Sequence, residues 1–306
     1  MKKVVLLALA LVYSLSSAAS RTGTFMSGGE TRSYTEFIPD THSAAPRPLI
    51  IVLHGRTGSG SGMARLTDFN TLAERENIVM LYPDGLGGEW NYTRGIPGYP
   101  AGAPDDVRFL ADLVDKISGE QAIDTKRIYV AGFSNGGFMT ERLACAAPER
   151  YAAFASVSAA GFGGMNLVCP ERYPASPVRL LFIHGTADTN IPWNGLARTV
   201  QGRSIPILYS VSDTLAFWAD AIGCEADITS QEPPAKSRNP RTEIRLLKFK
   251  GCPVGSALEL YAIGGGGHTW PGRPGFLPEE FAGVTSTELE ATQAIWDFFF
   301  EQTPAH

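Results

Sequence analysis

Apolar and polar positions along the chain predict β-strands that alternate with α-helices over most of its length. Residues 49–53 form a continuous apolar run, which is typical of a strand buried on both faces of a sheet. In residues 105–118 the apolar side chains recur every three or four positions, which predicts a helix that buries one face. The pattern predicts strands at residues 24–26, 31–38, 49–53, 78–81, 128–131, 154–158, 180–183, 243–248 and 258–263. It predicts helices at residues 63–76, 105–118, 136–147, 211–221 and 286–300.

This alternation is not interrupted by a linker rich in Pro, Ser or Gly. It favours a single α/β domain with a mostly parallel central sheet and helices on both faces. The chain of 306 residues contains 33 Gly and 21 Pro, which is too few for a disordered, low-complexity protein. Its formal net charge of −5 offers no basic surface to a polyanion, so we expect no nucleic-acid partner.

The start of the chain has the pattern of a secretory signal peptide. Two lysines precede an apolar run at residues 4–12, and small residues follow up to Ala19. The apolar run is much shorter than the roughly 20 residues that a membrane-spanning helix needs. We therefore expect a signal peptide at residues 1–19, cleaved after Ala19 or one residue earlier, and a single α/β domain at residues 20–306. We expect this protein to be a monomer without membrane contact, in the periplasm or outside the cell.

Export changes the interpretation of the cysteines. An even number of cysteines in an oxidising compartment favours disulfides, and four cysteines allow three pairings. Pairing neighbours in the sequence would join Cys145 to Cys169 and Cys224 to Cys252; the alternative is that they are reduced and buried. Because none lies in a C-x-x-C pair with nearby histidines, we expect no metal site.

Ser134 is the strongest candidate for a catalytic group. It is the serine of a G-x-S-x-G pattern at residues 132–136, between the predicted strand 128–131 and the predicted helix 136–147. Glycines permit so tight a turn because a Cβ would collide with neighbouring backbone. The turn would present the serine hydroxyl at a helix N-terminus, where the backbone N–H of Asn135 can stabilise a developing oxyanion.

A nucleophilic serine needs a base and a carboxylate that orients the base. Among five histidines, His268 lies in a glycine-rich stretch after the predicted strand 258–263, which allows it to approach Ser134. Asp188 follows the predicted strand 180–183, between the serine and the histidine. This order of Ser, Asp and His is the one found in the α/β-hydrolase fold.

The competing residues have structural explanations. His54 precedes the serine and is expected to shape the oxyanion loop, and His184 is expected to pack the loop that presents Asp188. Asp105 and Asp106 also precede the serine and are explained as helix caps.

A second oxyanion donor is expected just after His54. We predict the backbone N–H of Arg56, with that of Thr57 as the alternative. The glycine-rich residues 58–62 are not followed by the G-K-[ST] of a phosphate-binding loop, so we expect a flexible loop beside the pocket. The predicted mechanism requires neither a metal ion nor an organic cofactor, and we expect none.

Six short motifs occur in order along the chain. Through them the chain resembles the secreted polyhydroxybutyrate depolymerase and feruloyl esterase family of serine esterases, from about residue 49 to residue 272. The motifs are Leu53-His54-Gly55, Tyr82-Pro83-Asp84-Gly85, Asp105-Asp106-Val107, Gly132-Phe133-Ser134-Asn135-Gly136-Gly137, His184-Gly185-Thr186-Ala187-Asp188 and Gly267-His268-Thr269-Trp270-Pro271-Gly272.

The resemblance implies an α/β-hydrolase fold and the triad of Ser134, Asp188 and His268, and it favours the disulfides between sequence neighbours. It implies a serine carboxylic-ester hydrolase that acts through an acyl-enzyme. The expected substrates are hydroxyalkanoate oligomers or polymers, or acids linked by esters to plant polysaccharides. The alternatives are an acyltransferase or peptidase with the same triad, and a noncatalytic binding protein on a hydrolase scaffold.

Two departures from the family pattern affect the expected substrate. Arg56 stands where many relatives have Cys or Gly, which would reshape the pocket rim. We expect no separate polymer-binding domain, so soluble oligomers or side-chain esters are as plausible as a solid polyester. The candidates for lining the substrate pocket are Trp270, beside His268, and Trp90, Tyr92 and Trp193, and the alternative for each is core packing.

Overall fold

The structure is a computed structural model, and the predicted signal peptide lies outside the residues that it describes. The structure describes residues 20–40, 45–100, 102–169, 176–238, 240–275 and 277–301. Among these, no helix is both long enough and apolar enough to cross a membrane.

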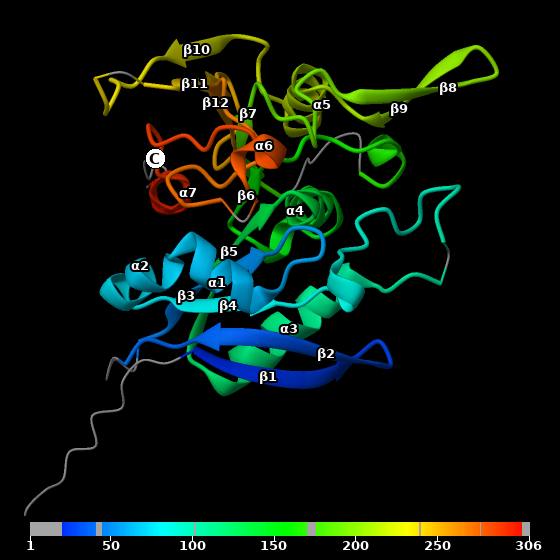
Figure 1. The fold of residues 1–306 in the computed structure, drawn as a ribbon. Helices are drawn as coiled ribbons and strands as arrows, with labels where there is room; N and C mark the ends of the chain where they lie inside the picture. The colour runs from blue at the N-terminus through cyan, green and yellow to red at the C-terminus, as the bar shows by residue number, and fades with distance from the viewer. Residues whose placement is uncertain are drawn as a thin grey trace, which may run out of the picture.

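A ten-stranded sheet runs through the molecule in the order β1-β2-β4-β3-β5-β6-β7-β12-β11-β10 (Figure 1). The inner strands from β4 to β12 pair in parallel, and the strands outside them pair antiparallel. This mostly parallel sheet confirms the predicted fold class. The strands are β1 (Ser20–Ser27), β2 (Glu30–Phe37), β3 (Arg47–Leu53), β4 (Val79–Pro83), β5 (Ile123–Phe133), β6 (Ala153–Val157), β7 (Arg179–Gly185), β10 (Ile228–Gln231), β11 (Glu243–Phe249) and β12 (Ala257–Gly264).

Helices cover both faces of the sheet, as the sequence predicts. One face carries α3 (Asp106–Glu120), α4 (Asn135–Ala146) and α5 (Val211–Ile222), and the other carries α1 (Gly60–Thr67), α2 (Phe69–Glu76) and α7 (Ala291–Phe300). Strand β3 serves both cores, since successive side chains point to opposite faces: Leu49 and Ile51 join one core, and Ile50 and Val52 join the other. Short helices lie at η1 (Leu86–Gly88), η2 (Pro148–Arg150), η3 (Met165–Leu167) and α6 (Glu279–Ala282).

Two predicted helices are wrong in extent. The helix expected at residues 63–76 is broken into α1 and α2, because Asp68 adopts a left-handed conformation with φ of 55°. The helix expected from residue 286 begins at Ala291, where the backbone N–H donates to the carbonyl of Pro271. The segment before it is held in an extended path because the carbonyl of Ser286 accepts from the N–H of Gly272.

The hairpin of β8 (Leu196–Val200) and β9 (Arg203–Leu208) is absent from the predicted elements, as are β10 and α6. The two strands of this hairpin pair with each other in a separate sheet and project from the body of the molecule (Figure 1). Nearly all their residues are exposed, so neither strand shows the alternation of buried and polar positions that reveals a half-buried strand.

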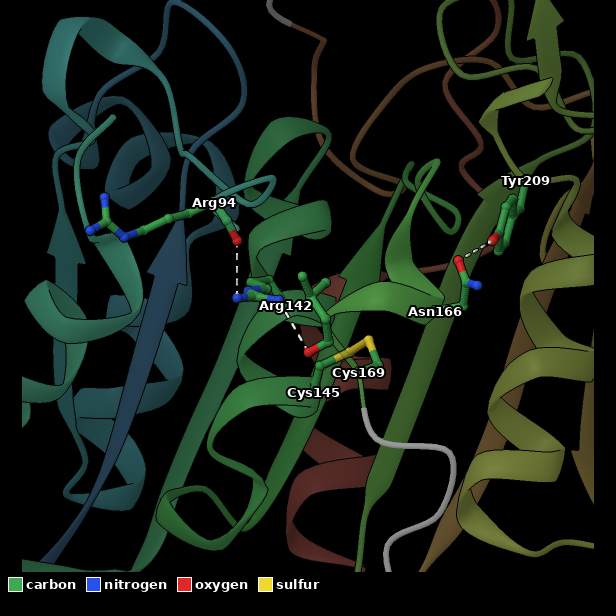
Figure 2. Close-up of a disulfide and its surroundings, with 7 residues drawn as sticks. Arg94, Arg142, Cys145, Asn166, Cys169 and Tyr209 are labelled. Atoms are coloured by element: carbon green, nitrogen blue, oxygen red, sulfur yellow. Dashed lines mark hydrogen bonds between the residues drawn. A yellow bond between two sulfur atoms is a disulfide. The ribbon is translucent and has the colours of Figure 1, made fainter. Parts of the chain in front are cut away.

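Both expected disulfides are present in the structure. Cys145, near the end of α4, is joined to Cys169, and the Arg142 guanidinium one turn earlier donates to the carbonyls of Val168 and Arg94, both at 3.2 Å (Figure 2). The disulfide and Arg142 thereby fasten two loops to the helix that follows Ser134. The second disulfide, Cys224–Cys252, ties the end of α5 to the loop after β11.

Glu141 is a fully buried carboxyl group on α4. Its Oε1 accepts a hydrogen bond of 3.0 Å from the hydroxyl of Ser156 on β6. Burial raises its pKa from 4.5 to about 8, because the charged form would lose its hydration. The folded chain therefore keeps this carboxyl protonated in the pH range where the unfolded chain ionises it.

Glu141→Gln should change the pH dependence of stability. Between pH 4.5 and about 8 the folded wild type binds one more proton than the unfolded chain, so its stability falls as pH rises. The amide does not titrate, so the variant should gain stability relative to wild type from pH 5 to pH 8, on the order of a few kcal/mol. Melting temperatures at the two pH values measure this. Glu149→Gln, at an exposed position, is the control, and an equal difference at both pH values would contradict the prediction.

Candidate active site

Ser134 lies in the tight connection between β5 and α4. Its backbone has φ of 54° and ψ of −116°, a conformation that non-glycine residues rarely adopt. The flanking glycines are required by space: a Cβ on Gly132 would lie 2.1 Å from the carbonyl oxygen of Gly136, and one on Gly136 would lie 2.5 Å from that of Leu53. The N–H of Ser134 donates to the carbonyl of Val157, so the turn is anchored to β6.

The structure brings the three predicted triad residues together in one hydrogen-bonded line. His268 Nε2 lies 2.9 Å from Ser134 Oγ, and His268 Nδ1 lies 2.8 Å from Asp188 Oδ2. The two side chains that flank His268 are far from it in sequence, and they meet it at the carboxyl ends of β5 and β7. This geometry allows His268 to accept the serine proton while its other ring nitrogen donates to the carboxylate.

Asp188 is held from both sides of its carboxylate. Oδ1 accepts from the backbone N–H groups of Asn190 and Ile191, at 2.9 and 2.8 Å, which leaves Oδ2 directed at His268. His184 lies behind it, with Nε2 2.9 Å from the carbonyl of Ile191. Burial lowers the pKa of His184 and keeps its imidazole neutral, consistent with the packing role predicted for it.

The two backbone N–H groups predicted as oxyanion donors belong to residues that line the cavities at Ser134. Among the described residues, the N–H groups of Asn135 and Arg56 have no hydrogen-bond acceptor. The N–H of Thr57, the alternative to Arg56, is taken by the carbonyl of Gly88 at 2.8 Å and is therefore not available. Asn135 is also the first residue of α4, where the helix dipole adds to the stabilisation of negative charge.

His54 braces the loop that carries Arg56. Its Nε2 accepts from the N–H of Gly85 at 2.9 Å, so Nδ1 carries the proton and donates to the carbonyl of Gly55 at 2.7 Å. Burial lowers the pKa of His54, which favours this neutral form. Both ring nitrogens of His54 are thus engaged with the backbone, so this residue does not face Ser134 as a base.

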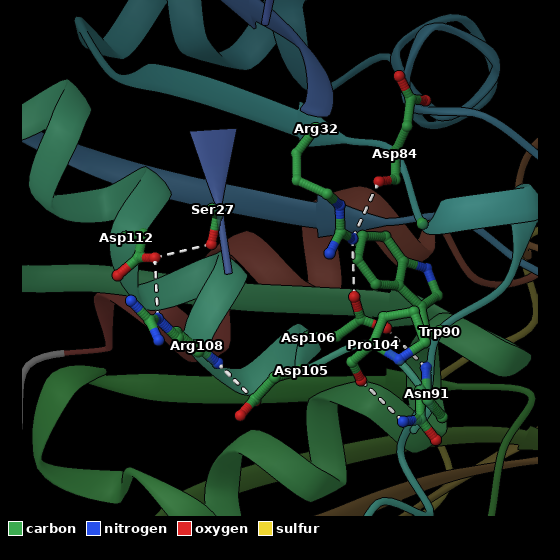
Figure 3. Close-up of polar contacts among 12 residues, drawn as sticks. Ser27, Arg32, Asp84, Trp90, Asn91, Pro104, Asp105, Asp106, Arg108 and Asp112 are labelled. Atoms are coloured by element: carbon green, nitrogen blue, oxygen red, sulfur yellow. Dashed lines mark hydrogen bonds and ion pairs between the residues drawn. The ribbon is translucent and has the colours of Figure 1, made fainter. Parts of the chain in front are cut away.

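Trp90 connects the loop at His54 to Asn135. Its indole N–H donates to the carbonyl of His54, and its backbone N–H donates to Asn135 Oδ1 at 2.6 Å. The adjacent Asn91 is fixed by a buried ion pair: Asp106 Oδ2 accepts from the Asn91 N–H, and Oδ1 accepts from Arg32, both at 2.7 Å (Figure 3).

The Arg32–Asp106 pair is the part of the site that the sequence-based interpretation missed. Asp106 was expected as an alternative helix cap, but Asp105 caps α3 by accepting from the N–H of Arg108. Asp106 is only 1% exposed and Arg32 2%, and the guanidinium lies over the Phe109 ring. An arginine in the strand 31–38, on a position facing the core, is the one signal that could have indicated a buried partner.

Ser134 lies where two cavities meet. The larger has a volume of about 700 Å³ and the smaller about 510 Å³, and both are lined by Ser134, Arg56 and Ile191. Cavities of this size accommodate drug-sized organic molecules. An ester bond placed at Ser134 would therefore have its acid and alcohol parts on opposite sides of the junction.

The aromatic candidates are distributed unequally over these cavities. Trp270 lines the larger cavity as a buried wall, with its indole N–H donated to Thr292 Oγ1 at 3.0 Å. Trp90 and Tyr92 line the smaller cavity. Trp193 lines neither; it is half-buried beside the ring of His184, so core packing, its predicted alternative, describes its position. Among the described residues, no three His, Cys, Asp or Glu side chains gather in a way that could hold a metal ion.

The sequence of this chain is similar to those of known esterases. Residues 32–169 match the family model described as Esterase PHB depolymerase. The putative esterase NocK of Nocardia uniformis subsp. tsuyamanensis is 28% identical over 278 residues, which cover 88% of this chain and 79% of that protein. Feruloyl esterase B of Piromyces equi is 30% identical over 226 residues, 72% of this chain but only 39% of that protein.

Solved structures agree on the fold. An acetyl xylan esterase from Aspergillus awamori superposes with a TM-score of 0.63 at 17% identity, covering 92% of this chain and 98% of that one. At this identity the likeness establishes the α/β-hydrolase fold alone. The matching family model and the esterase relatives together show that the chain is a carboxylic ester hydrolase.

Asp106→Asn should destabilise the protein and lower its activity. The substitution removes the counter-charge of a buried guanidinium, which typically costs about 3–5 kcal/mol, and it loosens Asn91 and Trp90 beside the oxyanion site. Chemical denaturation and ester-hydrolysis rates measure the two effects.

Asp105→Asn is the matched control at the same helix end, because Asn caps helices as well as Asp. Equal stability of the two variants would show that the buried ion pair is not needed.

Proposed function

We propose that this chain, a carboxylic ester hydrolase with an esterase PHB depolymerase domain at residues 32–169, forms an acyl-enzyme on Ser134. In this proposal His268 is the general base and Asp188 orients it. The observation that carries the proposal is the hydrogen-bonded line from Asp188 through His268 to Ser134, beside two unengaged backbone N–H groups.

In the first half-reaction Ser134 Oγ attacks the ester carbonyl carbon as His268 Nε2 takes the hydroxyl proton. The carbonyl oxygen becomes an oxyanion that accepts hydrogen bonds from the N–H groups of Asn135 and Arg56. The imidazolium then gives its proton to the departing alkoxide, so the alcohol leaves and the acyl group stays on Ser134. In the second half-reaction His268 takes a proton from water as the water oxygen attacks the acyl carbon. The bond between the acyl carbon and Ser134 Oγ then breaks, the imidazolium returns its proton to Ser134 Oγ, and the acid is released.

The role of Asp188 follows from how its two oxygens are used. Because Oδ1 is engaged by two backbone N–H groups, the carboxylate cannot rotate freely, and Oδ2 keeps the Nδ1–H tautomer of His268. The negative charge of the buried carboxylate also stabilises the imidazolium that forms when Ser134 attacks.

The proposed substrates are esters of hydroxyalkanoate oligomers or acids esterified to plant polysaccharides. The names of two relatives support this range of substrates. A Poly(3-hydroxybutyrate) depolymerase of Ralstonia pickettii is 34% identical over 143 residues, and Feruloyl esterase B is 30% identical over 226 residues. These matches cover 28% and 39% of those proteins, so their substrates enter here as candidates. The two cavities at Ser134 provide room for a substantial group on each side of the ester.

Active-site labelling tests this function. A fluorophosphonate should label one site per molecule, and Ser134→Ala should lose the label and at least about 1,000-fold of its activity on a p-nitrophenyl short-chain ester. Ser212→Ala, at an exposed position of α5, should keep both.

Full activity of Ser134→Ala, or no labelling of the wild type, would overturn the proposal. A panel of hydroxybutyrate oligomers, methyl ferulate, acetylated xylan and alkyl esters then selects the substrate. Cleavage of peptide p-nitroanilides, or ester formation with added alcohols, would instead indicate a peptidase or an acyltransferase.

We also propose that the protein is exported after removal of residues 1–19. The two disulfides support this, since such bonds persist in oxidising compartments. The exported protein should begin at Ser20, which N-terminal sequencing and intact mass will determine. Replacing the two lysines that precede the apolar run should leave the uncleaved chain inside the cell. An exported chain that retains Met1 would contradict the predicted cleavage.

A further inference from the structure

The larger of the two cavities at Ser134 has an unusual charge balance for this chain. Two arginines, Arg56 and Arg65, are among its lining residues, and none of the described lining residues is Asp or Glu. The whole chain has a formal net charge of −5, so positive charge is locally concentrated where the overall charge is negative. The smaller cavity differs, because Glu89 and Asp106 contribute to its lining.

The two arginines are not equivalent. Arg56 Nε lies 2.6 Å from Glu89 Oε1, so its charge already has a partner. Arg65, in the last turn of α1, has no hydrogen bond or ion pair with another residue in the described parts of the chain. Nearby arginines are paired, as Arg75 is with Glu76 at 2.8 Å and Arg273 with Asp68 at 3.2 Å. Among the described residues that line this cavity, Arg65 is therefore the cation without a partner, and it is free to bind an anion.

The rest of the cavity is suited to an aliphatic chain. Its wall includes Met63 and Leu66 from α1, with Phe133, Trp270 and Leu277 from elsewhere in the sequence. The described lining thus combines an apolar wall with a guanidinium and includes no Asp or Glu. Such a lining complements a molecule that is apolar along its length and carries a negative charge at a distance from its ester.

We propose that Arg65 binds the free carboxylate of the substrate, and that the enzyme prefers esters that carry such a carboxylate over neutral ones. This inference rests on the proposed function, because it places the ester carbonyl at Ser134 and the carboxylate-bearing part in the larger cavity. An oligomer of hydroxy acids has such a carboxylate at its end. The planar guanidinium can bind a carboxylate through two parallel hydrogen bonds.

The contact between Arg65 and the carboxylate should strengthen substrate binding and leave the rate of the chemical step unchanged. Arg65 is exposed and belongs to the substrate pocket, whereas bond cleavage occurs at Ser134. A contact made equally in the substrate and transition-state complexes lowers KM and leaves kcat unchanged. Since exposed ion pairs are weak and screened by salt, we expect a preference of about fivefold that declines as salt is added.

The test compares acids with their terminal amides, which have the same shape without the charge. One pair places the carboxylate on the acyl side of the ester: monoethyl adipate and the ethyl ester of adipic acid monoamide. The other places it on the alcohol side: the 3-hydroxybutyrate dimer and the same dimer with a terminal amide. Kinetics are followed by pH-stat and by chromatography of the products. The wild type should have a lower KM for the acid than for the amide in at least one pair. The pair that shows this difference tells whether the bound carboxylate lies on the acyl side or on the alcohol side of the ester.

Arg65→Gln should abolish this preference, because KM for each acid should rise to the KM of its amide-terminated counterpart. Arg65→Lys should retain part of it, because the charge remains without the bidentate geometry. Arg75→Gln, on α2 and away from the cavity lining, makes the same change in net charge and should behave as wild type. Melting temperatures identify any variant whose kinetics reflect unfolding.

If the wild type has nearly the same KM for the acid and for its amide-terminated counterpart in both pairs, this inference is overturned. A preference for the acid that survives in Arg65→Gln would overturn it as well. Both results leave the proposed function intact, since Ser134 still cleaves the ester bonds of the amide-terminated substrates. Failure of the wild type to cleave any of the four esters, together with unchanged activity of Ser134→Ala on a p-nitrophenyl ester, would overturn the proposed function as well.

Discussion

The backbone of Ser134, at φ 54° and ψ −116°, is the constraint on which the rest of the site depends. This conformation is unfavourable for a residue with a side chain, by roughly 1–3 kcal/mol, so the surroundings must hold it. They do so through the N–H of Ser134 bound to β6 and through Gly132 and Gly136, which let strand and helix approach without a Cβ between them. This backbone conformation places the Ser134 hydroxyl at the start of α4, within hydrogen-bond distance of His268.

The segment around Trp90, beside the proposed oxyanion donors, is held by a different kind of interaction, a buried ion pair. Arg32 on β2 and Asp106 on α3 fix Asn91, and the adjacent Trp90 links the His54 carbonyl to the Asn135 side chain. A buried pair of this kind gains little net stability over apolar packing, but removing one partner is costly. The position of the loops around Ser134 is thereby coupled to the folding of β2, which lies between β1 and β4 in the sheet.

Much of the fold and the triad could be predicted because their signals are local. The apolar run at residues 49–53 marks a buried strand, and Ser134, Asp188 and His268 each follow a strand in the expected order. What could not be predicted depends on contacts between distant segments. The left-handed conformation of Asp68 breaks a helix that the pattern 63–76 presents as continuous. The roles of Asp106 and Trp90 follow from partners on β2, the His54 loop and α4, which no local pattern reveals.

Ile191 shows why substrate selection and catalysis cannot be separated in this site. Its backbone N–H donates to Asp188, its carbonyl accepts from His184, and the residue lines both cavities. A ligand that displaced this segment would disturb the carboxylate that orients His268. Specificity is therefore more easily changed at positions such as Arg65, which lines only the larger of the two cavities, than at Ile191. The free guanidinium can adjust to a substrate without moving the groups that carry out the reaction.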